Sequence, residues 1–329
     1  MIKAAIVGLG RWGQNLVECT QGKSDKLRFT AGVARTPDKA RAFAAKHGLA
    51  LVADYAAALA DHGIDAVVLA TPHTQHAEQA VAAARHGKHV FTDKPFALTT
   101  ASATAAVKAC RKAKRVLAVG YNWRYQPALQ EIRRLVQDGR LGRLLHIEGN
   151  FNGPSVYRHA KEHWRQQRAE GPAGGMTGRG VHVVDAMLYL SGRIESVFAQ
   201  SDRLVLDHGL DDTTSMLFKF ANGATGYLGT VIATAECWRL QVFGSKGWAQ
   251  VGSIPHLHTW SLTTCMVDAP PTVIDYPQRS SERAELEAFA DAIEGGPSFA
   301  CSPEEAIHGV AVLEAIVASA TSGRRETVD

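Results

Sequence analysis

Short apolar runs alternate with alanine-rich amphipathic stretches over the first 120 residues. Such runs predict buried strands, and stretches with an apolar helical face predict helices. The expected strands are residues 2–7, 27–34, 50–53, 65–70, 88–92 and 116–121, and the expected helices are 11–21, 37–47, 54–61, 74–86 and 99–114. Strands separated by helix-length connections pair in parallel. The pattern therefore predicts a doubly wound parallel α/β sheet of the Rossmann type.

The pattern changes near residue 121, after which strand-like runs follow one another. The expected elements are a helix at 127–138, strands at 143–151, 194–206, 213–220, 224–233, 237–243, 247–252 and 257–263, and helices at 281–294 and 303–320. Consecutive strands joined by turns predict a largely antiparallel open sheet. We therefore expect a Rossmann domain over residues 1–121 and an α+β domain over residues 122–329.

Composition excludes several classes of protein. A chain of 329 residues that is 46% hydrophobic and 21% charged is neither disordered nor fibrous. The net charge of +4 comes without a run of five or more like charges, so no nucleic-acid partner is expected. The residues after Met1 predict a strand rather than a signal peptide, and no apolar run approaches the ~20 residues of a membrane span. We expect a cytoplasmic protein without a membrane partner.

The cysteines indicate neither a disulfide framework nor a metal site. They are odd in number, widely separated and contain no C-x-x-C pair. Their positions are Cys19, Cys110, Cys237, Cys265 and Cys301. We expect reduced thiols and no bound metal.

A glycine-rich loop follows the first predicted strand and opens the first predicted helix. Gly8-Leu9-Gly10-Arg11-Trp12-Gly13 is a G-x-G-x-x-G motif in the context that dinucleotide binding requires. In such a loop the first glycine makes a tight turn, the second admits the pyrophosphate and the third lets the helix pack closely. Arg11 and Trp12, within the loop, are candidate cofactor contacts. We expect a dinucleotide at this helix N-terminus.

The end of the second predicted strand bears on the choice of cofactor. An acidic residue there would bind the ribose 2′-hydroxyl of NAD, but Ala34 stands at that position. Arg35 and Thr36 follow, and a guanidinium is well matched to a phosphate. The sequence therefore favours NADP, with NAD as the alternative. Arg35 as a solvated turn residue is the competing interpretation.

Three further segments carry a family resemblance. They are Ala70–His76 after the fourth strand, Gly87–Pro95 over the fifth, and Gly174–Asp185 in the second domain. With the glycine loop they resemble the glucose-fructose oxidoreductase / inositol dehydrogenase / MocA family over nearly the whole chain. The resemblance implies that the cofactor is bordered by residues of the first two segments, namely Thr71, Pro72, His73, His76, Asp93 and Lys94.

The resemblance also implies which residues are catalytic. The family's glutamate-lysine-proline motif matches Asp93-Lys94-Pro95, so Lys94 takes the place of its catalytic lysine. The family's histidine in the second domain matches His182. Asp185 lies one helical turn further if residues 180–190 form a helix. It either holds His182 or serves packing and capping, and both interpretations stay open.

Two positions depart from the family pattern. Many family dehydrogenases carry an aspartate four residues before the histidine, where this chain has Gly178. Either Lys94 and His182 suffice, or another residue substitutes, or the chemistry is altered. Candidate substitutes are Tyr157, His159 and His163. His73 stands where the family often has asparagine.

By resemblance, the protein is an NAD(P)-dependent dehydrogenase or reductase. It is expected to transfer hydride between nicotinamide and the hydroxyl or carbonyl carbon of a sugar, cyclitol or dihydrodiol, and to form a homodimer or homotetramer. Gly178 keeps one alternative open, a regulatory protein that binds the cofactor without turnover. Another is an enzyme that oxidises its substrate transiently during elimination or hydrolysis.

Overall fold

The computed structural model describes residues 1–253 and 260–329. It divides the chain into two compact units. The first unit comprises Met1–Asn122 and Ser280–Ile307, and the second comprises Trp123–Arg279 and His308–Asp329.

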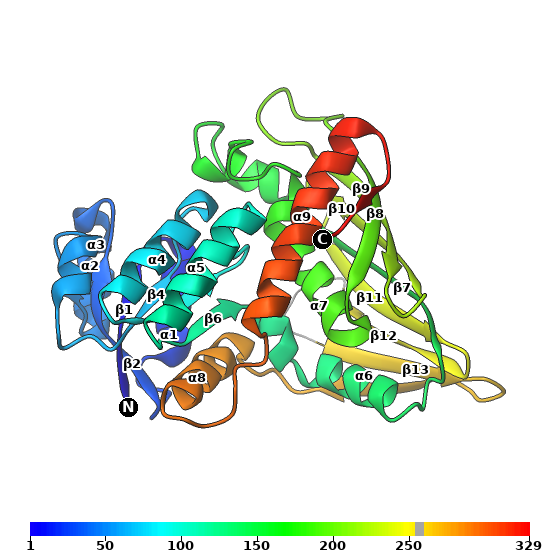
Figure 1. Cartoon of the computed structure of the whole chain (residues 1–329), viewed down its shortest axis with the longest axis horizontal. Helices are drawn as coiled ribbons and strands as arrows, with labels where there is room; N and C mark the ends of the chain where they lie inside the picture. Colours follow the sequence, from blue (N-terminus) through cyan, green and yellow to red (C-terminus); the bar gives the residue numbers. More distant parts are fainter. Residues whose placement is uncertain (254–259) are drawn as a thin grey trace. The chain divides into compact units, whose positions relative to one another are not determined.

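The first unit contains a six-stranded parallel sheet in the order β3-β2-β1-β4-β5-β6 (Figure 1). The strands are β1 (Ile2–Val7), β2 (Leu27–Val33), β3 (Ala50–Leu51), β4 (Ala66–Leu69), β5 (His89–Asp93) and β6 (Leu117–Gly120). The helices between them are α1 (Arg11–Thr20), α2 (Pro37–His47), α3 (Tyr55–Ala60), α4 (His76–Arg85) and α5 (Thr100–Lys112). The predicted Rossmann sheet is confirmed. Its strand order reverses between β1 and β4, where open α/β sheets bind ligands.

Short polar side chains and glycine set the helix ends in this unit. The Asp54 carboxylate accepts the backbone N–H of Ala57 at 2.8 Å and so caps α3. Gly48 ends α2 in the left-handed conformation, with φ +67°. Ser302, directly before α9 (Pro303–Ser322), exchanges hydrogen bonds with Glu305 in a capping box.

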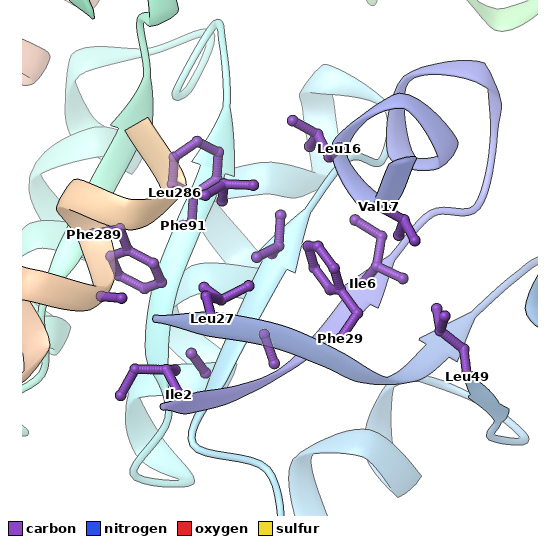
Figure 2. Packing of buried hydrophobic residues seen from close by; sticks show 14 of the residues in the cluster. Ile2, Ile6, Leu16, Val17, Leu27, Phe29, Leu49, Phe91, Leu286 and Phe289 are labelled. Atoms are coloured by element: carbon purple, nitrogen blue, oxygen red, sulfur yellow. The ribbon is translucent and has the colours of Figure 1, made fainter. Parts of the chain in front are cut away.

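Helix α8 (Ser281–Ile293) belongs to the first unit, although the sequence places it in the domain of residues 122–329. Leu286 and Phe289 lie in the same buried cluster as Ile2, Leu27 and Phe91 (Figure 2). The rings of Phe91 and Phe289 meet edge to face, with centroids 5.8 Å apart. The apolar face of α8 completes the core of the parallel sheet, so this helix folds with a sheet that is remote in sequence.

The second unit contains a nine-stranded sheet within the described residues (Figure 1). Its order is β14-β13-β12-β11-β7-β10-β9-β8-β15. The strands are β7 (Leu144–Asn152), β8 (Ile194–Asp202), β9 (Thr213–Phe220), β10 (Thr225–Val231), β11 (Cys237–Gly244), β12 (Gly247–Ser253), β13 (Trp260–Met266), β14 (Thr272–Tyr276) and β15 (Glu326–Thr327). Only the β7–β10 pair is parallel among these strands. The predicted, largely antiparallel sheet is confirmed. Helices α6 (Pro127–Gln137) and α7 (Val181–Ser191) pack on it.

Some strands of the second unit differ from the sequence expectation. Strand β8 ends at Asp202 rather than 206, because the Asp212 carboxylate accepts the backbone N–H groups of residues 204–206. The expected strand 257–263 is described from Trp260 onward, and residues 257–259 lie outside the described part. Strand β14 was not predicted. Its residues are mostly exposed and show no alternation of buried and exposed positions.

Candidate functional site

The glycine loop after β1 packs tightly at two of its three glycines. Gly8 has φ +98°, and a Cβ there would lie 2.6 Å from the carbonyl oxygen of Ala70, after β4. A Cβ on Gly13 would lie 2.0 Å from the carbonyl oxygen of Gly8. No side chain fits at either position. The loop is thereby held against the ends of β1 and β4, at the point where the strand order reverses.

Gly10 differs, because a Cβ there would meet none of the described atoms within 4 Å outside its own stretch of chain. Gly10 is also the N-cap residue of α1, and no side chain in the described residues caps this helix. The first turn of α1 has no acidic residue. Its backbone N–H groups thus remain available to an anion, and the open space beside Gly10 admits one. These features fit the pyrophosphate of a dinucleotide.

The other loop residues occupy distinct environments. The Arg11 side chain is exposed, whereas Trp12 is half-buried and packs against the core of the first unit. At the end of β2, Arg35 and Thr36 are exposed, and Ala34 is half-buried. The structure therefore leaves a guanidinium, and no carboxylate, at positions 34–36.

The ends of β4 and β5 contribute the next group of candidates. Thr71, Pro72 and His73 are half-buried, and the Thr71 hydroxyl donates to Gln79 Oε1 at 2.6 Å. Asp93 is the last residue of β5 and is buried. Lys94 follows directly and is half-buried. The parallel register of β4 and β5 brings the two segments to one edge of the sheet.

His76 lies elsewhere than the family resemblance implies. Its ring is fully buried, with 0% exposure, so the side chain offers no surface to a bound cofactor. Nδ1 lies 2.9 Å from the carbonyl oxygen of Pro95, and Nε2 lies 2.9 Å from that of Thr71. His76 therefore joins the segments after β4 and β5 from within the protein.

In the second unit, His182 lies in the first turn of α7 and is buried. Its ring stacks on Trp123, with centroids 5.4 Å apart and planes inclined by 16°. Phe151 of β7 lies 6.1 Å from the same ring. A π-helical turn, Met176–Gly180, precedes α7. Within it, a Cβ on Gly178 would meet no described atom within 4 Å outside its own stretch of chain, so the backbone has room for the family's aspartate.

Asp185, one turn after His182, forms a buried ion pair with Arg124. The guanidinium donates through Nε and Nη2, and the shortest distance is 2.7 Å between Nη2 and Oδ1. The Arg124 guanidinium also lies over the Tyr189 ring, 5.0 Å from its centroid. The sequence is consistent with either a catalytic or a structural role for Asp185, and the structure shows a structural partner, Arg124. The residue types around Arg124, in the segment Tyr121–Pro127, do not indicate this pairing from sequence alone.

The candidate substitutes for the missing aspartate lie in the segment between β7 and α7. Tyr157 is exposed, and the rings of His159 and His163 stack at 4.3 Å. Trp164 continues the stack, and the Arg165 guanidinium lies 4.2 Å from its ring centroid. This segment therefore presents rings and cations, and among these five residues there is no carboxylate.

Comparison with known proteins bears directly on this geometry. The family model for the oxidoreductase family with an NAD-binding Rossmann fold matches residues 2–121, and the GFO/IDH/MocA C-terminal domain model matches residues 129–250. The chain belongs to the GFO/IDH/MocA oxidoreductase family. Both matched segments fall within the units that hold the glycine loop and His182.

Similar proteins match over most of this GFO/IDH/MocA chain. It is 28% identical to inositol 2-dehydrogenase of Rhizobium meliloti over 337 aligned residues, 99% of both chains. It is 26% identical to scyllo-inositol 2-dehydrogenase (NAD(+)) of Bacillus subtilis, covering 90% of this chain and 87% of that one. The structure of aldose-aldose oxidoreductase from Caulobacter crescentus, complexed with glycerol, superposes with a TM-score of 0.90 at 26% identity and 99% coverage of both chains.

The described ranges 1–253 and 260–329 hold neither a cluster of metal ligands nor a membrane-spanning helix. No group of three or more histidine, cysteine, aspartate or glutamate side chains there could hold a metal ion. No helix in the same ranges has the length and apolar character needed to span a membrane. All five cysteines are free thiols.

Proposed function

We propose that this protein is a dehydrogenase or reductase that prefers NADP(H) and acts on a CH–OH carbon of a sugar or cyclitol. The observation that supports a bound dinucleotide cofactor is the contrast among the three glycines of the loop. Gly8 and Gly13 are closed by protein atoms, whereas Gly10 opens onto space at an uncapped helix N-terminus. The proposed substrate class rests on relatives named for inositol and aldose.

Lys94 is the proposed acid–base residue. It follows the last residue of β5, at the carboxyl edge of the parallel sheet, and is half-buried. Its ammonium can donate a hydrogen bond to the substrate oxygen and exchange a proton with it as the carbon changes oxidation state. When bound, the nicotinamide supplies the hydride chemistry. Aligning the oxygen falls to the protein.

His182 is proposed as the second acid–base group of the reaction. Its ring is held on Trp123 and Phe151, so its orientation is set before substrate binds. Asp185 acts behind it: Arg124 neutralises the carboxylate, and the pair holds the second turn of α7 in place. We assign Asp185 to positioning rather than to proton transfer.

The preference for NADP rests on the end of β2. Arg35 and Thr36 are exposed there, and Ala34 replaces a carboxylate. A guanidinium binds a 2′-phosphate well, and an acidic residue would repel it. The relative named for NAD(+) makes this preference a matter for direct measurement.

Titration with NADPH and with NADH, read by tryptophan-to-nicotinamide energy transfer, should show tighter binding of NADPH. Arg35→Ala should reduce the affinity for NADPH. Equal or tighter NADH binding contradicts the preference.

The decisive test of the enzymatic role is Lys94→Ala on a polyol found by screening inositols, aldoses and dihydrodiols. Turnover should fall by about 10²–10⁴-fold, the usual contribution of an acid–base group. Lys112→Ala, at the exposed end of α5, is the matched control and should leave turnover unchanged. Turnover of Lys94→Ala within about threefold of the original would remove the assigned role.

Gly178 favours a second candidate, a regulatory protein that binds the cofactor without turnover. This function predicts tight NADPH or NADH binding, no turnover across the screen, and a protein partner recovered with the cofactor-bound form. Transient oxidation during elimination or hydrolysis predicts instead that substrate is consumed with no net change in nicotinamide absorbance.

A homodimer or homotetramer is also proposed. Leu217 of β9 and Tyr227 of β10 are cross-strand partners, and both are exposed on the second unit's sheet. Sedimentation or light scattering would show the assembly, and Leu217→Glu with Tyr227→Lys should shift it toward the monomer if this face is used.

A further inference from the structure

The buried ring of His76 connects two segments that the proposed function places beside cofactor and substrate. His76 is the first residue of α4, and both ring nitrogens lie 2.9 Å from backbone carbonyl oxygens, those of Pro95 and Thr71. A carbonyl oxygen only accepts hydrogen bonds, and a neutral imidazole carries one N–H. The ring therefore donates to one of the two carbonyls, and its other nitrogen makes a close contact without a hydrogen bond. The His76 residue is 0% exposed, and the contact to Pro95 is buried.

The two carbonyl groups lie at the ends of neighbouring strands. Thr71 follows β4, and Pro95 follows β5 with Lys94 directly before it. In the parallel register, Leu69 of β4 pairs with Thr92 of β5. The ladder ends there, so its hydrogen bonds do not extend to Lys94. The His76 ring continues the connection between the two segments beyond the sheet.

The Thr71 side of this connection reaches the glycine loop. A Cβ on Gly8 would lie 2.6 Å from the Ala70 carbonyl oxygen and 3.2 Å from the Thr71 nitrogen. The backbone at Ala70–Thr71 is thus packed against the loop that would hold the pyrophosphate. Through His76, the same backbone is tied to the peptide next to Lys94.

We propose that His76 is a positioning residue that fixes the backbone at Lys94 through a hydrogen bond from Nδ1–H to the Pro95 carbonyl oxygen. The proposal rests on the proposed function, in which Lys94 acts on the substrate. A displacement of about 1 Å at a reacting group can cost about 100-fold in rate, so loss of this bond should appear in kcat.

Two substitutions separate the two contacts. In His76→Asn, the amide nitrogen can occupy the place of Nδ1 and keep the bond to Pro95. In His76→Gln, the amide nitrogen can reach the place of Nε2, so it offers a donor to Thr71 and none to Pro95. His76→Ala removes both. His86→Asn, at the exposed end of α4, is the matched control.

The first readout is turnover of the best polyol from the screen. We expect kcat of His76→Asn to stay within about threefold of the original, and kcat of His76→Gln and His76→Ala to fall about 10–100-fold. NADPH affinity of His76→Gln should be unchanged, which a general loss of structure would not allow. Equal kcat for the Asn and Gln variants, or a larger loss for Asn, overturns the proposal.

The second readout does not depend on activity. Hydrogen–deuterium exchange of a peptide covering residues 93–99 should be faster in His76→Gln than in His76→Asn, with NADPH absent. If His76→Ala does not fold, the Asn and Gln pair still decides. Equal exchange in that pair contradicts the assigned bond.

A double-mutant cycle separates this inference from the proposed function. If His76 acts through Lys94, His76→Gln should lower the residual kcat of Lys94→Ala by less than twofold, far less than in the original background. An undiminished effect in the Lys94→Ala background overturns the positioning role. Full activity of Lys94→Ala alone would instead overturn the proposed function, and the exchange experiment would still report on the His76 bond.

Discussion

The imidazole ring of His182 stacks face to face on the indole of Trp123, with centroids 5.4 Å apart and planes inclined by 16°. The ring of Trp123 also packs against those of Trp238 and Trp260, with centroid distances of 4.9 Å and 5.3 Å. The proposed catalytic ring is therefore one surface of a buried aromatic cluster in the second unit. Its orientation depends on residues that would be classed as core by burial alone.

Trp123→Ala should both destabilise the second unit and disturb His182. Removing a buried tryptophan leaves a cavity that costs roughly 3–5 kcal/mol. Trp123→Phe keeps a ring beneath His182 and should cost less, with turnover mostly retained. Urea unfolding and kcat at a temperature where both variants are folded would check this. Equal kcat for the Ala and Phe variants would show that the stack has no part in turnover.

The Arg124–Asp185 pair should behave as a buried ion pair. The two side chains are 1% and 4% exposed, so removing one charge leaves the other buried without its partner. Arg124→Met or Asp185→Asn should each lower the free energy of unfolding by roughly 3–5 kcal/mol. The double variant should cost less than the sum of the two, because neither charge is then left alone.

An exposed pair supplies the control for that experiment. Arg41 and Asp38 are 73% and 85% exposed and lie 2.7 Å apart on α2. Breaking this pair should change stability by roughly 0–1 kcal/mol. Denaturant unfolding of all the variants would test the contrast. A cost for Arg124→Met similar to that for Arg41→Met would contradict the buried-pair interpretation.

The glycine loop offers a matched pair of substitutions. Gly13→Ala places a Cβ 2.0 Å from the Gly8 carbonyl oxygen and should destabilise the first unit. Gly10→Ala meets no described atom within 4 Å outside its own stretch of chain, so the fold should be unchanged. Its methyl group should instead occupy the space proposed for the pyrophosphate and weaken NADPH binding. Thermal unfolding and NADPH titration would separate the two effects. Normal NADPH binding by Gly10→Ala would argue against a cofactor at this loop.

Two histidines should make stability fall with acid. Burial, with the nearby Arg115, lowers the pKa of His89 to about 4, and burial with Arg193 lowers the pKa of His308 to about 4. In the unfolded chain both pKa values return to about 6.5, so the unfolded state binds more protons between pH 4 and 6.5. The contribution of these two histidines to the free energy of unfolding is therefore full above pH 6.5 and is lost as the pH falls toward 4.

Substitution at His308 tests that pH dependence. Its Nε2 accepts the backbone N–H of Ile194 at 3.2 Å, a role that the Gln oxygen can take without titrating. Between pH 7 and pH 5 the free energy of unfolding should decrease by roughly 1–2 kcal/mol less in His308→Gln than in the unsubstituted protein. Exposed His62→Gln is the control and should leave the slope unchanged. Denaturant unfolding across this pH range would measure both, and parallel curves for His308→Gln and the original would contradict the assignment.

Much of the first unit could be predicted from local pattern. Apolar runs and helix-length connections determine parallel pairing, and the first and last glycines of the G-x-G-x-x-G motif stand where only glycine fits. Lys94 could be located for the same reason, because a residue directly after a parallel strand lies at the carboxyl edge. The edge strand β14 could not be predicted, because its residues are mostly exposed and show no alternation of buried and exposed positions.

The roles of His76, Trp123 and α8 were decided only by the tertiary structure. Sequence shows that α8 has an apolar face, but not that this face packs on the parallel sheet against Phe91. It shows a histidine at position 76, but not that carbonyl groups from two strand ends converge on its ring. Local pattern determines which elements form, because it reflects backbone geometry and the burial of one face. Partners distant in sequence are determined by how those faces pack, and packing brings together groups that no local spacing relates.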